Sequence, residues 1–125
     1  MSRHTTTRLA LPIAAALVMA GCATTSHQPL YGWDGYQPQV YEYLKSSGNA
    51  DAEQQVAKLE EAQQKIEQRG QALPPGYRAH MGMLYAKAGQ DEKSVAALTA
   101  EKTTFPESAS FMDFLLRTLT GKAPQ

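Results

Sequence analysis

The first 22 residues limit most strongly what this chain can fold into, because an apolar run lies there beside the single cysteine. Residues 1–8 are polar and carry Arg3 and Arg8 without an acidic residue, and residues 9–20 are almost wholly apolar. This run of 12 residues is too short for a transmembrane helix, which needs about 20. A basic segment, a short apolar segment and small residues at the end are typical of a secretory signal. The folded part is therefore expected to begin after residue 21, with residues 1–21 removed as a signal peptide.

The residues around the expected cleavage point are Met19, Ala20, Gly21 and Cys22. They resemble the lipobox of bacterial lipoproteins, with methionine where leucine is commonest. The resemblance implies cleavage after Gly21, a diacylglyceryl group on the Cys22 thiol and an acylated new amino terminus. Ala23 replaces the aspartate that favours inner-membrane retention in enteric lipoproteins, which implies an anchor in the outer membrane and a domain on its periplasmic face. The alternative is an ordinary secretion signal with Cys22 near the cut by chance.

The part of the chain after residue 21 has 104 residues, which suits one small domain. Removal of Arg3 and Arg8 leaves 10 basic residues against 12 acidic ones, a net charge near −2. Nucleic-acid binding requires a basic surface, so we expect no nucleic-acid partner. Cys22 is the only cysteine, so no disulfide can form within the domain and its stability must come from packing.

Residues 22–37 are expected to form the lipidated cysteine and a tether, because they are rich in turn-forming residues and lack a helical or strand period. The second half of this segment contains Tyr31, Trp33 and Tyr36 within six residues. Two interpretations remain open. The rings can form an exposed arm for a partner, a glycan or a membrane interface, or they can fold back over the first helices and complete a small core.

Helical periodicity and helix breakers after residue 37 predict an all-α domain over residues 38–121, followed by a tail at 122–125. Four to five helices are expected, arranged as short tetratricopeptide-like hairpins. Their approximate ranges are 38–46, 52–70, a third after the prolines at 74 and 75 up to residue 88, 91–104 and 107–120. No segment has a convincing strand pattern.

The apolar positions predict which helix faces pack. In the first helix Val40, Tyr41 and Leu44 share a face, and in the fourth Val95 and Leu98 do so. The last helix has six large apolar residues, too many for one face, so we expect one stripe to pack on the fourth helix and another to stay exposed. Phe111, Leu115 and Leu119 form one stripe, Met112 and Leu116 lie on a neighbouring one, and Phe114 lies further around.

Two sets of residues are therefore candidates for partner binding. Phe114 and Leu116 come from the last helix, and Tyr31, Trp33 and Tyr36 come from the aromatic segment. The rival expectation is that the aromatic segment folds over the last helix, with Trp33 as a lid.

Residues 75–108 resemble a single tetratricopeptide repeat, a 34-residue pattern of two packed helices. The small residue, the tyrosine, the turn residue and the closing proline of that pattern correspond to Gly82, Tyr85, Gly89 and Pro106. The resemblance implies that Gly82 lets the paired helix approach closely and that Tyr85 fills the space between helices. Ser94 and Glu101 depart from the pattern, which has small apolar residues there. A generic helical hairpin ending at a proline remains the alternative.

Over residues 31–119 the chain also resembles a family of small proteobacterial lipoproteins that carry a domain of unknown function. The resemblance lies in Tyr-Gly-Trp at 31–33, Tyr-Gln-Pro at 36–38, Leu-Pro-Pro-Gly at 73–76 and Phe-Pro-Glu-Ser at 105–108. Genes of that family often lie beside those of a curli-export-like outer-membrane lipoprotein and a second small lipoprotein. The resemblance therefore implies a role in envelope assembly and an envelope protein partner, for which a curli-export-like lipoprotein is a candidate.

The sequence contains no recognisable set of catalytic or metal-binding residues. His27 and His80 are the only histidines after residue 21, and no HExxH motif, Cys/His cluster or Gly-rich phosphate loop is present. We therefore expect no enzyme activity, no metal and no cofactor apart from the covalent lipid on Cys22. Two functions remain: a periplasmic protein-interaction or assembly module, and alternatively a cell-wall glycan-binding protein that uses Trp33 and the neighbouring tyrosines.

Overall fold

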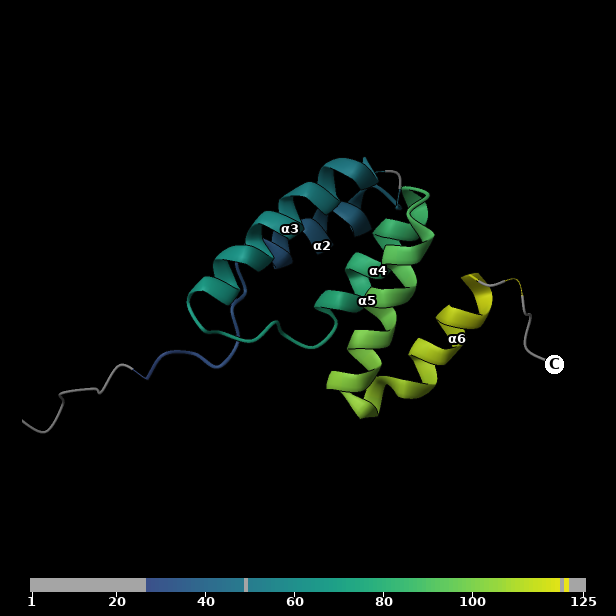
Figure 1. The fold of residues 1–125 in the computed structure, drawn as a ribbon. Coiled ribbons are helices and arrows are strands. Elements are labelled where there is room, and N and C mark those ends of the chain that lie inside the picture. The colour runs from purple at the N-terminus through teal and green to yellow at the C-terminus, as the bar shows by residue number, and fades with distance from the viewer. Residues whose placement is uncertain (1–26, 49, 120, 122–125) are drawn as a thin grey trace, which may run out of the picture.

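A computed structural model describes residues 27–48, 50–119 and 121, and this part of the chain is all-α, as the sequence predicts (Figure 1). Its helices are α2 (Tyr36–Lys45), α3 (Ala52–Gln68), α4 (Tyr77–Lys87), α5 (Asp91–Thr104) and α6 (Ala109–Leu119), with a 3₁₀ turn η2 (Pro106–Ser108) before α6. Figure 1 shows α4 and α5 between the α2–α3 pair and α6. The expected signal peptide, its cleavage motif from Met19 to Cys22, and the tail at 122–125 lie outside the described residues.

Local sequence signals set most helix ends where they were predicted. The Oδ1 atom of Asp51 accepts the N–H of Gln54 at 3.0 Å, which caps the start of α3. Gly89 follows the end of α4 with a φ of 73°, a left-handed conformation that glycine adopts without strain. Pro106 opens η2, so the last α-helix begins two residues later than predicted, at Ala109.

The first helix starts earlier than the sequence predicts. Gly35 has a φ of 66° and the N–H of Tyr36 donates to the carbonyl of Trp33 at 3.1 Å, which turns the chain into α2 at Tyr36. Pro38 is then the third residue of the helix. It still lies in the first turn, where a missing N–H breaks no hydrogen bond within the helix.

Helix α2 packs through a face other than the one predicted. Tyr36 and Tyr43 contact the core, whereas Tyr41 and Leu44 are exposed and Val40 is only half-buried. The expected inward face was therefore wrong. Large rings at positions 36 and 43 bury more apolar area than the face through Val40 and Leu44, and this difference sets the rotation of the helix.

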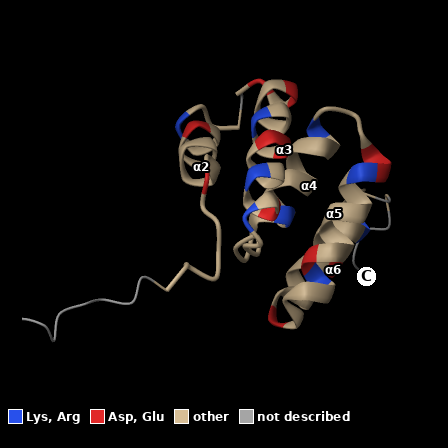
Figure 2. Cartoon of the chain, turned by 60° about the vertical axis from the view of Figure 1, so that its left-hand side comes forward, with Lys and Arg blue, Asp and Glu red and all other residues tan. Residues whose placement is uncertain are grey.

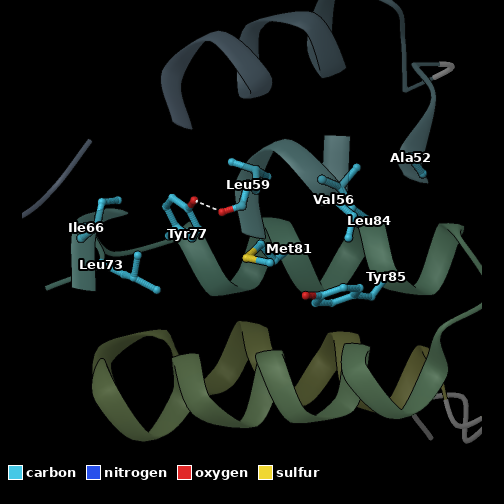
Figure 3. Close-up of a cluster of buried hydrophobic side chains, with 9 residues drawn as sticks. All are labelled: Ala52, Val56, Leu59, Ile66, Leu73, Tyr77, Met81, Leu84 and Tyr85. Carbon is cyan, nitrogen blue, oxygen red and sulfur yellow. Dashed lines mark hydrogen bonds between the residues drawn. The ribbon is translucent and has the colours of Figure 1, made fainter. Parts of the chain in front are cut away.

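The core surrounds α4, which packs on α3 and on α5 (Figure 3). One cluster joins α3, the turn before α4, and α4 itself; it contains Ala52, Val56, Leu59, Ile66, Leu73, Tyr77, Met81, Leu84 and Tyr85. The hydroxyl of the fully buried Tyr77 donates to the carbonyl of Leu59 at 2.7 Å. The hydroxyl of Tyr85 donates to Oε1 of Glu60 at 2.8 Å, so both rings are buried with their polar ends satisfied.

Helices α4 and α5 approach each other most closely at Gly82. A Cβ atom there would lie 2.8 Å from the side chain of Leu98 and 3.3 Å from the carbonyl oxygen of Ser94. The Ser94 hydroxyl donates to the carbonyl of Gly82 at 2.7 Å inside this contact. Because the crossing brings Ser94 inward, α5 buries Ser94, Leu98 and Glu101 and exposes Val95. The predicted face is therefore confirmed at Leu98 and wrong at Val95.

Glu101 joins the end of α5 to the start of α4. Its side chain is 1% exposed, and its Oε1 atom accepts the N–H of Gly76 at 2.6 Å. Gly76 directly precedes α4, so the carboxylate lies near the positive end of that helix dipole. The Oε2 atom has no hydrogen-bond partner in the described part of the chain. Burial, and to a smaller degree this carboxylate, raises the pKa of Tyr36.

The segment before α2 belongs to the folded domain, so the predicted tether at 22–37 extends too far. The N–H of Gly32 donates to the carbonyl of Ala72 at 2.9 Å, and the N–H of Ala72 donates to the carbonyl of Leu30 at 3.0 Å. Gly32 is buried against Ile66, where a Cβ atom would lie 2.6 Å from the isoleucine side chain. The domain therefore begins near residue 30 rather than at residue 38.

Candidate functional site

Helix α6 packs on the rest of the domain through Met112. This side chain is buried with Ala79 of α4 and Leu98 of α5, and Leu115 and Leu116 pack against the same cluster. The small side chain of Ala79 leaves room for the long Met112 side chain, so Met112 packs inward whereas Phe111 stays exposed. Leu116, predicted as a partner-binding residue, therefore belongs to the packing face.

The outer face of α6 exposes large apolar side chains. Phe111 is 55% exposed and Phe114 is 44% exposed, and their rings stack with centroids 6.4 Å apart and planes inclined by 14°. Leu119, at the end of the helix, is exposed as well. We call Phe111, Phe114 and Leu119 the α6 patch. Phe114, a predicted partner-binding residue, lies on it.

An apolar groove of about 200 Å³ lies beside the α6 patch. We call it the α4–α6 groove, because most of its walls come from these two helices. Its lining residues are Tyr43, Met83, Ala86, Leu98, Leu115, Thr118 and Leu119. Leu119 belongs to both the groove and the patch, so the two form one continuous apolar surface. Continuous apolar surface of this kind on a small domain is typical of a protein-binding site.

Tyr43 is the α2 wall of the groove, and the buried His80 lies behind it. The two rings meet edge to face with centroids 5.3 Å apart, and Tyr36 contacts the imidazole at 6.1 Å. Burial lowers the pKa of His80, so the imidazole is mostly neutral at pH 7. The Nζ atom of Lys87 lies 5.9 Å from the centroid of the Tyr43 ring and adds positive charge at this end of the groove.

The aromatic residues Tyr31, Trp33 and Tyr36 do not cover α6. Tyr31 lies 6.5 Å from Phe105 and Tyr36 lies 5.0 Å from Tyr77, measured between ring centroids. Trp33 contacts Tyr36 at 6.1 Å but remains largely exposed. The expectation of a Trp33 lid over the last helix is wrong, because backbone pairing holds this segment beside the end of α3. Of the three aromatic candidates, two pack inward and one keeps an exposed ring.

The sequence matches the family described as Domain of unknown function (DUF4810) over residues 30–115. The chain belongs to this family. The match begins where the pairing with Ala72 starts the domain and ends within α6, so it spans all the described helices up to Leu115. No curated protein and no solved structure matched the chain. In the part of the DUF4810 protein that the structure describes, no helix is long and apolar enough to cross a membrane.

Sequence reasoning missed the α4 wall of the groove. Ala79, Met83 and Ala86 follow one another at helical spacing and form a second apolar face of α4, opposite the face of Met81 and Leu84. This second face meets α6 in the DUF4810 domain. The signal was present in the sequence, as an apolar stripe on each side of one short helix.

Proposed function

We propose that this DUF4810 protein is an outer-membrane lipoprotein whose periplasmic domain is a protein-interaction module. The observation that carries the interaction role is the continuous apolar surface of the α6 patch and the α4–α6 groove. Burial of one large apolar side chain contributes about 1.5–3 kcal/mol. The domain leaves 55% of Phe111 and 44% of Phe114 exposed to water, so a partner that covers these rings gains part of this free energy on binding.

The chemistry of the groove specifies the partner segment that we propose. Apart from Thr118 and the hydroxyl group of Tyr43 the lining is apolar, so the groove suits a row of apolar side chains, such as one face of an amphipathic helix. Lys87 lies at the Tyr43 end, where an acidic side chain of the partner would complement its charge. The family resemblance favours an envelope protein as partner, and a curli-export-like lipoprotein is one candidate.

The lipoprotein part of the proposal rests on the Met19-Ala20-Gly21-Cys22 motif and predicts a lipid on Cys22. We expect Cys22→Ala to abolish the incorporation of labelled palmitate and to block the usual maturation, because the mutant has no thiol to acylate. Thr24→Ala is the matched control and should keep wild-type labelling. Equal labelling of wild type and Cys22→Ala would contradict the anchor.

The interaction role predicts that the α6 patch holds a partner in the cell. We expect Phe111→Ser combined with Phe114→Ser to abolish the partner crosslinks of the wild type, while the thermal midpoint of the purified protein barely moves, since both rings are exposed. Tyr41→Ser combined with Leu44→Ser, at exposed positions of α2, is the matched control and should keep the crosslinks. A patch variant that unfolds, or that keeps its crosslinks, would place the binding surface elsewhere.

A further inference from the structure

Large exposed apolar side chains also lie on and before α2. Trp33 is 45% exposed, Tyr41 is 61% exposed and Leu44 is 68% exposed. We call these three residues the α2 face. The helix packs inward through Tyr36 and Tyr43, and none of its own residues is buried. The α2 face therefore contributes little to the core, and its composition needs another physical reason.

We propose that the α2 face rests on the headgroup region of the membrane that holds the Cys22 lipid. This inference depends on the lipid anchor of the proposed function. Tryptophan and tyrosine favour the boundary between membrane and water, where an apolar ring and a polar edge are both accommodated. The Nζ atom of Lys45 lies 5.8 Å from the centroid of the Tyr41 ring, so a positive charge that attracts anionic headgroups accompanies the rings.

The position of the anchor favours a lipid surface over a protein at this face. His27 follows Cys22 by five residues, and an extended chain of that length reaches at most about 18 Å. Figure 2 shows α2 at the edge of the helices, on the same side as residues 27–35. The anchor therefore keeps the start of α2 close to the membrane. The anchor also makes the contact between the α2 face and the membrane effectively intramolecular, so a small apolar face is sufficient to maintain this contact.

This orientation separates the two exposed surfaces of the domain. Figures 1 and 2 both place α6 on the side opposite the N-terminal segment. With the α2 face on the membrane, the α6 patch and the α4–α6 groove point away from the lipid, toward the periplasm. The α2 face then orients the domain on the membrane, and the α6 patch and the α4–α6 groove remain accessible to a protein.

The single tryptophan of the chain makes the orientation measurable, because all tryptophan fluorescence comes from Trp33. The lipidated protein is reconstituted in vesicles of phosphatidylethanolamine and phosphatidylglycerol that include lipids brominated near the headgroup. We expect the Trp33 emission to shift to shorter wavelength and to be quenched, relative to Cys22→Ala protein mixed with the same vesicles. Tyr41→Ser with Leu44→Ser should lose most of this quenching while still floating with the vesicles. Phe111→Ser combined with Phe114→Ser, on the α6 patch, should keep the quenching of Trp33.

Three results would overturn the inference. The first is wild-type protein that floats with the vesicles while aqueous iodide quenches Trp33 as strongly as in Cys22→Ala. The anchor would then stand, and the α2 face would not touch lipid. Failure to float would overturn the anchor itself. Protection of Trp33 only after addition of an envelope extract would show that a protein covers the face. Circular dichroism of the Tyr41 and Leu44 double variant separates lost membrane contact from lost folding.

Discussion

Gly82→Leu is expected to destabilise the domain by about 1–3 kcal/mol or more, because it overpacks the crossing of α4 and α5. Even a Cβ atom at this position would lie 2.8 Å from the Cγ and Cδ2 atoms of the fully buried Leu98, so the leucine side chain would have to shift. The carbonyl oxygen of Ser94, 3.3 Å from the same point, belongs to the backbone and yields less readily. For a domain of this size the thermal midpoint should fall by at least about 4 °C, as measured by circular dichroism.

Ala57→Leu is the matched control for this substitution, since Ala57 is exposed in the middle of α3. We expect Ala57→Leu to leave the midpoint nearly unchanged. If position 82 were exposed, leucine would stabilise the helix by nearly 1 kcal/mol, because glycine is a poor helix former. A midpoint of Gly82→Leu equal to or above that of the wild type would contradict the close crossing.

Glu101→Ala is expected to destabilise the domain by about 1–3 kcal/mol, because it leaves the N–H of Gly76 without its acceptor. The deleted side chain is almost fully buried, so the substitution also leaves a cavity beside the start of α4. Chemical denaturation at pH 7, followed by circular dichroism, measures the change in the free energy of unfolding.

Glu101→Gln separates the hydrogen bond from the charge. Glutamine keeps an Oε1 acceptor and nearly the same volume, so we expect it to retain most of the stability that alanine loses. If Glu101→Ala unfolds at the same denaturant concentration as the wild type, the contact with Gly76 does not stabilise the domain. If Glu101→Gln loses as much as Glu101→Ala, the charge matters more than the hydrogen bond.

The positions of the helices could be predicted from the sequence because local residues set them. Asp51 caps α3 through its own side chain, and Gly89 ends α4 through its left-handed backbone conformation. Such signals act over three or four residues and do not depend on the rest of the fold. The start of α2 was less predictable, since it depends on a turn at Gly35 that follows the pairing of the preceding segment with Ala72, in the loop after α3.

It was harder to predict which face of each helix packs inward. That choice depends on the neighbouring helices, whose residues lie elsewhere in the sequence. Helix α5 exposes Val95 and buries Ser94, since Gly82 of α4 lets the serine come close. Helix α6 buries Met112 rather than Phe111, since Ala79 of α4 leaves space there. In each case a small residue on α4 decides which side chain of the next helix packs.

The candidate site was predictable only in part for the same reason. An excess of large apolar residues on the last helix indicated an exposed surface, and Phe114 lies on it. The groove beside it needs Met83 of α4 and Tyr43 of α2, which lie 40 residues apart in the sequence numbering. Only the packing of α2, α4 and α6 brings such residues together. Cys22 depends on no packing, since its expected modification follows from the adjacent motif alone.

The central claim is that a protein partner occupies the α4–α6 groove, and site-specific photo-crosslinking in living cells tests it most directly. A photoreactive amino acid is placed at Ala86 or at Thr118, on opposite walls of the groove, and at the exposed Ala57 of α3 as control. We predict that both groove positions capture the same envelope protein and that the Ala57 position does not. Capture from Ala57 but from neither groove position would contradict the claim.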